Sequence, residues 1–206
     1  MKTSAFCYSR SMLVIRLSAF FLFAMVVVQI MLGCKETPSA QSVANAVTLE
    51  GNYQSPGMPE NNSRFNCRRN EVMTGRQHYG DEKGETKYRC KAVMYNSTAL
   101  ELTGYSWSGN IKESEGRWFT CGSNKVIVSR EHDGDENGNT RYRCASVSVP
   151  NSGAVLSVVN EGGEYFFEKE SSHSFNCPAN RAMVARYHRG DENGNTYYRC
   201  GYFQNP

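Results

Sequence analysis

The chain has 206 residues and carries 23 lysines and arginines against 20 aspartates and glutamates, a formal net charge of +3. Lys2, Arg10 and Arg16 are the charged residues before residue 34, so the remainder carries 20 residues of each sign and is formally neutral. Binding to nucleic acid depends on neutralising many phosphates, and no polybasic run is present. We therefore expect no nucleic-acid partner.

Residues 1–33 have the pattern of a secretory signal peptide. An almost wholly apolar stretch, residues 17–32, follows a segment whose charges are all basic. It ends Met31-Leu32-Gly33-Cys34, which resembles the lipobox of bacterial lipoproteins. The resemblance implies that Cys34 receives lipid, including palmitate, and anchors the protein in a membrane. Because Lys35 follows rather than aspartate, we expect the outer membrane, with the protein facing either side of it.

Other interpretations of this segment stay open. An uncleaved signal anchor is one, although 16 apolar residues are few for a span of about 20. An ordinary signal peptide is another, in which case Asn61 and Asn96 become glycosylation acceptors. Met12 is an alternative start. Residues 34–45 are polar and predict a tether, and residues 46–206 are long enough for one domain.

A block of 26 residues then occurs three times, with copies that begin 54 and 56 residues apart. The copies run from Phe65 to Cys90, Phe119 to Cys144 and Phe175 to Cys200, and they share F-x-C-x-x-N followed by R-x-H-x-G-D-E-x-G-x-T-x-Y-R-C. Such a period indicates one supersecondary unit packed against its copies, over residues of about 46–93, 99–147 and 153–203. Enzymes rarely carry three copies of one active site, so the repeat argues against catalysis.

Six of the eight cysteines lie in the repeats, at a spacing of 23 positions. An even count at matched spacing in an exported chain predicts disulfides. The repeat favours the pairs Cys67–Cys90, Cys121–Cys144 and Cys177–Cys200. Each would close a loop that stabilises the fold by roughly 3 kcal/mol. Zinc is the rival interpretation, but no close Cys/His pairing at zinc spacing is present.

Each repeat predicts four strands and no helix. The first strands contain Val47-Thr48-Leu49, Leu100-Glu101-Leu102 and Ala154-Val155-Leu156. Later strands begin at Val72-Met73-Thr74, Val126-Ile127-Val128 and Ala182-Met183-Val184, and a last strand leads to Cys90, Cys144 and Cys200. Asn-Gly between the last two strands of repeats two and three is a strong hairpin signal. Three such units predict an all-β structure closed with pseudo-threefold symmetry, either a trefoil or a prism.

The repeats also share a polar set in which arginine and histidine are two positions apart on a strand and so point to one face. The candidate ligand-binding residues are Arg76, His78, Asp81, Arg130, His132, Asp135, Arg186, His188 and Asp191, with Glu82, Glu136 and Glu192 beside the aspartates. The set could form polar pockets that donate hydrogen bonds to sugar hydroxyls or to a carboxylate. Alternatively, each arginine could pair with the aspartate across its hairpin and only hold the fold together.

Metal and catalytic motifs are weaker. Asp135-x-Asn137-x-Asn139 copies the start of a calcium loop, but Thr140 and Ser146 stand where that loop needs glycine and glutamate. No G-x-S-x-G, H-E-x-x-H or phosphate loop occurs. We expect no metal, no cofactor and no enzymatic activity.

Aromatic residues outside the repeat consensus are a second candidate surface. They are Tyr105, Trp107, Trp118, Tyr165, Phe166, Phe167, Tyr187 and Tyr197. Tyrosine and tryptophan suit sugar faces and protein hot spots alike, and we include Tyr105 and Trp107 among the candidate binding residues. Core packing is the alternative, favoured for Trp118.

The cysteine-bracketed units, with F-x-C, a strand, an acidic turn and an aromatic residue two positions before the second cysteine, resemble dermatopontin repeats. The likeness covers 26 residues in each copy, although Thr86-Lys87-Tyr88 and its counterparts replace the family's Asp-Arg-x-Trp signature. This resemblance implies adhesion or carbohydrate recognition. We therefore expect a lipid-anchored envelope protein that binds a glycan or a host or envelope surface, or alternatively an inhibitor or immunity protein that binds a toxin or hydrolase through one face.

Overall fold

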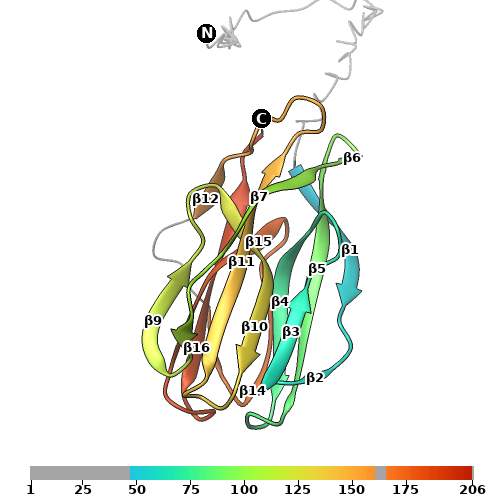
Figure 1. Ribbon diagram of the computed structural model, residues 1–206. Helices are drawn as coiled ribbons and strands as arrows, with labels where there is room; N and C mark the ends of the chain where they lie inside the picture. The colour runs from blue at the N-terminus through green and yellow to red at the C-terminus, as the bar shows by residue number, and fades with distance from the viewer. Residues whose placement is uncertain (1–46, 161–165, 206) are drawn as a thin grey trace, which may run out of the picture. The chain divides into compact units, whose positions relative to one another are not determined.

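The computed structural model describes residues 47–160 and 166–205 (Figure 1). The predicted signal peptide, Cys34 and the tether lie outside these residues. Every element within the described ranges is a β-strand, which confirms the all-β prediction. No helix there is long and apolar enough to cross a membrane.

Each repeat is built on one long antiparallel hairpin. The hairpins are β4 (Glu71–Tyr79) with β5 (Glu85–Tyr95), β10 (Lys125–Asp133) with β11 (Asn139–Ser148), and β15 (Arg181–Arg189) with β16 (Asn195–Phe203). The turns need the consensus Gly-Asp. Gly80, Gly134 and Gly190 have φ of 106°, 102° and 91°, a region that favours glycine. The next aspartate accepts the backbone N–H two residues on at 2.9 Å in all three turns.

Each hairpin is the centre of its own sheet. We name the three sheets A, B and C after the first, second and third hairpin. Each hairpin pairs on one side with a strand of its own repeat, which is β1 (Val47–Gln54), β7 (Glu101–Trp107) or β12 (Val158–Asn160). Short strands complete the edges: β2 (Met58–Pro59) and β6 (Thr98–Ala99) in sheet A, β8 (Ile111–Lys112) in B and β13 (Phe166–Lys169) in C. The separate sheets correspond to the prism alternative, since a trefoil has one barrel.

On its other side each hairpin pairs with a strand from a different repeat. Strand β3 (Asn62–Asn66) of repeat one pairs with β10, β9 (Glu115–Thr120) of repeat two pairs with β15, and β14 (Ser172–Asn176) of repeat three pairs with β4. Each repeat thus contributes one strand to the sheet of the next repeat, and repeat three contributes its strand to the sheet of repeat one. This closes the pseudo-threefold structure, and Figure 1 shows β3 and β14 beside the hairpins that receive them.

The disulfides join neighbouring sheets. All three predicted bridges are present, each with a Cα–Cα distance of 5.8 Å. Cys67 follows the exchanged strand β3 in sheet B, whereas Cys90 lies on β5 in sheet A. The other two bridges repeat this relation around the axis. Each bridge therefore fixes an exchanged strand to the repeat that supplies it.

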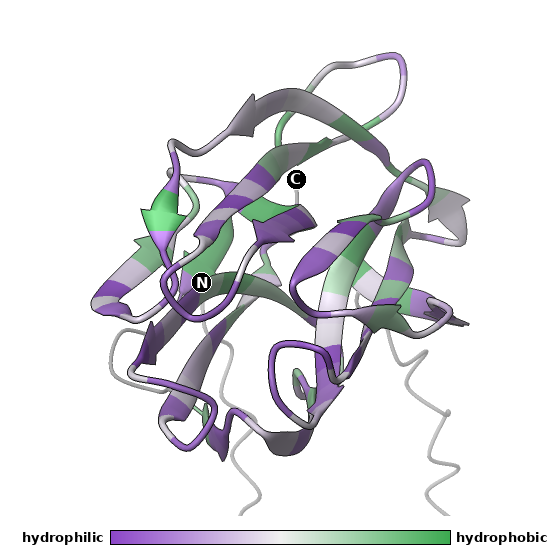
Figure 2. Cartoon of the chain, turned by 60° about the horizontal axis from the view of Figure 1, so that its bottom comes forward, coloured by the Kyte–Doolittle hydropathy of each residue, from purple (hydrophilic) through white to green (hydrophobic). Residues whose placement is uncertain are grey.

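The sheets enclose two apolar clusters. One is aliphatic and includes Leu100, Leu156 and Val72, each at most 1% exposed. The other contains the disulfides and the consensus phenylalanine and tyrosine of each repeat, stacked with ring centroids 4.3 to 4.6 Å apart. Figure 2 shows hydrophilic colour on the turns that come forward at one end of the molecule. The apolar core therefore gives way to polar groups toward that end.

One predicted strand differs from the structure. In repeat three we expect a strand over residues 154–156, but only Val155 forms an isolated bridge there, with Ser148, and the strand β12 begins at Val158. Leu156 is nonetheless fully buried. The Leu156 side chain therefore packs in the core, although its backbone is not part of a strand.

Candidate functional site

Three buried arginines lie on the inner face of the hairpins. Arg76, Arg130 and Arg186 are 1%, 1% and 3% exposed, and the histidines two positions later are equally buried. Strand alternation places both residue types inward, as predicted. A buried charge is costly unless it is paired. The partners of these arginines therefore decide what the repeated polar set does.

The partners are three glutamates, Glu60, Glu113 and Glu170, each of which lies shortly before an exchanged strand. Arginine and glutamate alternate in a closed ring of six ion pairs. The ring runs Arg76–Glu60 (2.9 Å), Glu60–Arg130 (2.6 Å), Arg130–Glu113 (2.6 Å), Glu113–Arg186, Arg186–Glu170 (2.9 Å) and Glu170–Arg76 (2.6 Å). Three positive and three negative charges from all three repeats thus balance one another. We call these six residues the axial ring.

This ring corrects one prediction. The arginines pair with these glutamates and not with the aspartates of the hairpin turns, whose carboxylates accept turn amides instead. Because the arginine side chains are buried, a ligand on the surface cannot contact them where they lie.

The glutamates are absent from the 26-residue pattern. An acid does precede the first cysteine of each repeat, but at seven positions in repeats one and three and at eight in repeat two.

Tyrosine hydroxyls of the aromatic cluster contact the axial ring on the side away from the turns. Each arginine donates to the consensus tyrosine of another repeat: Arg130 to Tyr88 at 2.9 Å, Arg186 to Tyr142 at 3.2 Å and Arg76 to Tyr198 at 3.3 Å. Burial alone would raise the pKa of Glu60, but Arg130 and Arg76 more than offset it and lower this pKa to about 2. The ring is therefore fully charged at neutral pH.

Three histidines form the next layer toward the turns. In each, Nε2 lies 3.0 to 3.2 Å from the carbonyl oxygen of the glycine two residues on. A carbonyl only accepts, so Nε2 is protonated in all three histidines, and Nδ1 faces inward. His132 Nδ1 lies 3.0 Å from Glu113 Oε2, whereas His78 and His188 lie 4.0 and 3.9 Å from Glu60 and Glu170. Burial first, and the ring arginines second, lower the pKa of His78 and of His188.

A fourth histidine breaks the symmetry of this layer. His173 stands on the exchanged strand β14 opposite His78, where the corresponding residue on β3 is Ser63, opposite His132. Its Nε2 lies 2.8 Å from the Tyr198 hydroxyl, and its Nδ1 lies 3.0 Å from the Lys169 and Glu170 carbonyls. Burial and the nearby Arg76 lower the pKa of His173 to about 4. This histidine is therefore neutral at pH 7.

A small cavity opens between the histidine layer and the turns. It is lined by the three glutamates of the ring, by His78, His132 and His188, and by Asp81, Glu82, Asp135, Glu136, Asp191 and Glu192. The volume open to the centre of a water molecule is about 30 Å³, where one water needs about 10–15 Å³. The cavity therefore admits an ion or a few waters but no sugar ring.

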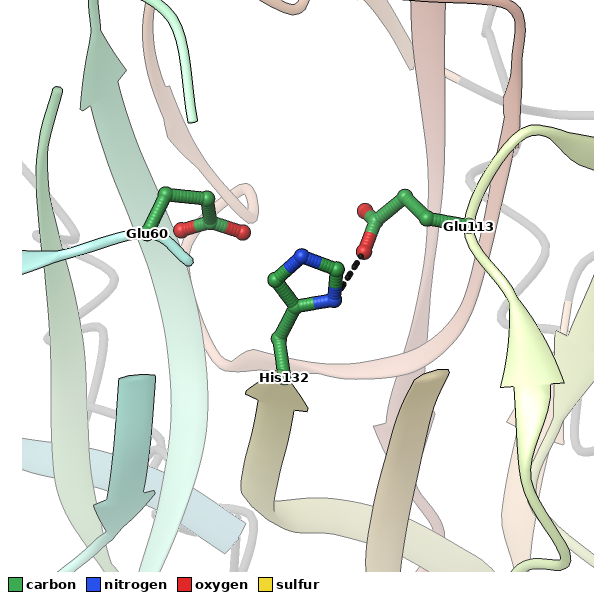
Figure 3. A group of neighbouring side chains, drawn as sticks. All are labelled: Glu60, Glu113 and His132. Atoms are coloured by element: carbon green, nitrogen blue, oxygen red, sulfur yellow. Dashed lines mark ion pairs between the residues drawn. The ribbon is translucent and has the colours of Figure 1, made fainter. Parts of the chain in front are cut away.

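Within this cavity three side chains offer atoms suited to a metal ion. Glu60, Glu113 and His132 each present one such atom, and all three atoms lie within 4.8 Å of one another. Figure 3 shows the two carboxylates and the imidazole turned toward one another. The cluster joins Glu60 of repeat one to two residues of repeat two.

A row of aromatic residues crosses the outer face of sheet C. Phe167, Tyr197, Tyr187 and Trp118 are direct cross-strand neighbours on four adjacent strands. Their successive ring centroids are 6.1, 5.4 and 5.5 Å apart. Phe167 is 65% exposed, and the other three are half-buried. Trp118 also packs against the aliphatic cluster, as predicted for this residue. The Arg199 guanidinium lies 4.1 Å from the Trp118 ring centroid.

The matching rows of the other two sheets are polar. Sheet B has Arg141, Glu131 and Arg64 in this row, joined by ion pairs of 2.6 and 3.5 Å. Sheet A has Lys87, Gln77 and Ser174. The same backbone positions therefore carry a polar surface twice and an aromatic one once. We call the four residues of sheet C the aromatic row.

Tyr105 and Trp107 lie on β7, the edge strand of sheet B, and are 43% and 39% exposed. Arg143 covers Tyr105 at 4.2 Å, and Arg141 covers Trp107 at 4.7 Å. Tyr105 also lines a groove of about 380 Å³ beside the first disulfide. Both are candidate binding residues in the sequence, and the structure places them on the surface, away from the residues that line the axial cavity. Tyr165 lies outside the described residues.

Comparisons with known proteins add no assignment: no protein family, no curated protein and no solved structure gives a significant match to this chain.

Proposed function

We propose that this protein is a non-catalytic binding protein of the cell envelope, lipid-anchored through Cys34, and that it binds a glycan through the aromatic row. The aromatic row is the observation that carries the proposal. Four large aromatic side chains in one contiguous strip, one of them exposed and three half-buried, are uncommon on a soluble surface. The row is polar in two sheets and aromatic only in sheet C, on matching backbone positions, and such a difference between equivalent surfaces is expected where one of them has a specific function.

The shape of the row favours a sugar chain as its ligand. Adjacent strands are about 4.8 Å apart, so four strands present an apolar strip, with rings tilted to one another by 41° to 76°, that spans more than one sugar ring. Aromatic rings bury the apolar faces of sugars, and the phenol hydroxyl of Tyr187 supplies a polar contact at the same surface. Arg199 beside Trp118 adds a donor at one end. The three disulfides agree with an extracytoplasmic location.

A glycan array tests the proposal on the full chain, with its disulfides oxidised, in a mild detergent. We expect saturable binding to a defined glycan class, and a loss of about tenfold or more in affinity for Tyr187→Gln, because removal of a central aromatic contact costs at least about 1.4 kcal/mol. Glutamine is the residue of repeat one at this position, so the fold accommodates it.

Gln77→Ala is the matched control, since Gln77 holds the same position in sheet A. It should bind glycans as the unchanged protein does. Absence of glycan binding by the folded protein, or equal losses in both variants, would reject the aromatic row as a glycan site.

A protein ligand is the second candidate, and the Tyr105/Trp107 pair under its two arginines favours it. Tyrosine, tryptophan and arginine are the residues most enriched at hot spots. An inhibitor or immunity protein would use this one face, and a Trp107→Ala variant would then lose its partner while it keeps any glycan binding.

A further inference from the structure

We propose that the axial cavity binds one divalent transition-metal ion of the Zn²⁺ class, through Glu60, Glu113 and His132. The geometry of the ligand atoms is the first argument. His132 Nδ1 and Glu113 Oε2 are 3.0 Å apart, close to the separation of about 3.3 Å that two ligands adopt around an ion with bonds of about 2.0–2.1 Å. A carboxylate oxygen of Glu60 lies within 4.8 Å of both groups.

Unpartnered buried atoms are the second and independent argument. Glu60 Oε2, His78 Nδ1 and His188 Nδ1 are buried without a hydrogen-bond partner, on residues that are 6%, 1% and 3% exposed and that line the cavity. Both arginine partners of Glu60 approach its other oxygen, Oε1. Because a carbonyl accepts from the Nε2–H of His78 and His188, the unpartnered Nδ1 of each of these two histidines presents a lone pair to the cavity. Lone pairs of oxygen and nitrogen that face one shared space are satisfied by a cation.

Histidines that bind metals usually donate their other ring N–H to a backbone carbonyl or a carboxylate, which fixes the orientation of the ring. His132 has this arrangement, since its Nε2 lies 3.1 Å from the Gly134 carbonyl oxygen. The Thr140 hydroxyl donates to Glu113 and so orients the second ligand, while its oxygen, 2.7 Å from His132 Nδ1, accepts a proton that the ion would replace on binding. The supporting contacts of a metal site are thus already in place.

Charge also favours a cation. The ring arginines balance the three ring glutamates, but six further carboxylates line the mouth of the cavity: Asp81, Glu82, Asp135, Glu136, Asp191 and Glu192. A narrow cleft lined by charges of one sign concentrates ions of the opposite sign. The cavity has room for one ion with a water. Mixed nitrogen and oxygen ligands in a small number select Zn²⁺, Co²⁺ or Ni²⁺ over Ca²⁺, which takes six to eight oxygens.

Calorimetric titration of Zn²⁺ into the full chain, treated with a chelator and then dialysed, tests this site. We expect one ion per chain in the unchanged protein and at least a tenfold weaker affinity in His132→Ala. His173→Ser is the matched control: His173 is buried nearby but does not line the cavity, so its replacement should leave Zn²⁺ affinity unchanged. Equal Zn²⁺ affinity in His132→Ala and in the unchanged protein would overturn the proposal. It would show that the ion binds elsewhere, for example at a thiol that both proteins carry.

Cobalt provides a readout that needs no variant, should His132→Ala fail to fold. Co²⁺ bound by nitrogen and oxygen ligands gives a visible absorption band, which we expect to saturate at one ion per unchanged chain and to disappear when Zn²⁺ is added. No band, or a band that Ca²⁺ removes as effectively as Zn²⁺, would contradict the site. Glycan binding depends on the aromatic row, so failure of either proposal leaves the other standing.

Discussion

Replacement of Glu170 by glutamine is expected to lower the free energy of unfolding by about 3–5 kcal/mol, because removal of one partner from a buried ion pair leaves its counterpart buried and uncompensated. Glu170 contacts Arg76 through one oxygen and Arg186 through the other, at 2.6 and 2.9 Å. Glutamine has the same shape but no charge, so two arginines lose part of their compensation at once. Guanidinium denaturation followed by tryptophan fluorescence measures the change.

Asp133→Asn is the control for this experiment. Asp133 pairs with Arg64 at 2.8 Å, but the two side chains are 57% and 55% exposed, and exposed pairs contribute only about 0–1 kcal/mol. A Glu170→Gln protein as stable as Asp133→Asn would show that the axial ring does not hold the fold together.

Acid is expected to destabilise the metal-free protein in two stages. The pKa of His173 is lowered from 6.5 to about 4 by burial and by Arg76. The unfolded chain therefore takes up this proton more readily than the folded one, so stability is complete above pH 6.5 and decreases as the pH falls toward 4. By linkage this one histidine accounts for about 3 kcal/mol, and His78 and His188 add to it in the same direction.

Below pH 4.5 the glutamates of the ring add the second stage. Their pKa values in the folded protein lie below the usual value of 4.5, that of Glu60 at about 2. Protonation thus favours the unfolded chain as the pH falls from 4.5 to 2.

Denaturation midpoints between pH 8 and pH 3 test this dependence, with His173→Ser as the variant. Serine stands at the corresponding position of the first exchanged strand, as Ser63, so the strand tolerates it. The variant should lose part of the decline between pH 6.5 and 4 and keep the decline below 4.5. A stability profile that is flat between pH 7 and 4 would contradict the buried, neutral histidines.

The sequence predicts the parts of this fold that local chemistry determines. The Asp-Glu turns, the hairpins, the inward alternation of Arg76 and His78 and the three disulfides follow from turn residues, strand periodicity and cysteine spacing. The repeat also predicts closure. It does not predict that strands such as β3 and β14 pair with the neighbouring repeat, because an exchanged strand and an intra-repeat strand bury the same side chains and make the same number of backbone hydrogen bonds.

The ring glutamates are the main site residues that the sequence does not predict. Glu60 and Glu170 lie seven residues before a cysteine, but Glu113 lies eight residues before one, so no fixed pattern aligns them. The additional residue is absorbed by a register shift where β9 meets β15, between His188 and Arg189. The alternative prediction, in which each arginine pairs with the aspartate of its own hairpin turn, is wrong because that aspartate accepts a backbone N–H of the turn.

The residues shared by the repeats and those that differ therefore have separate roles. Shared glycine, aspartate, phenylalanine, tyrosine and cysteine build turns, stacks and bridges, and the shared arginines build the ring. Differences collect on outward positions, above all at Tyr187 and Trp118, where the other repeats have polar residues. A binding surface on one sheet of a symmetrical scaffold follows from that division.

A double-mutant cycle between Arg76 and Glu170 tests the closed ring most directly, since this pair joins repeat three to repeat one across 94 positions of sequence. The measurement is the free energy of unfolding of Arg76→Met, Glu170→Gln and the double variant. The ring predicts that the double variant loses about 2 kcal/mol less than the two single losses together, within the range observed for contacting charged residues. Losses that add to within about 0.5 kcal/mol would show that the two residues are not in contact and that the ring is not closed.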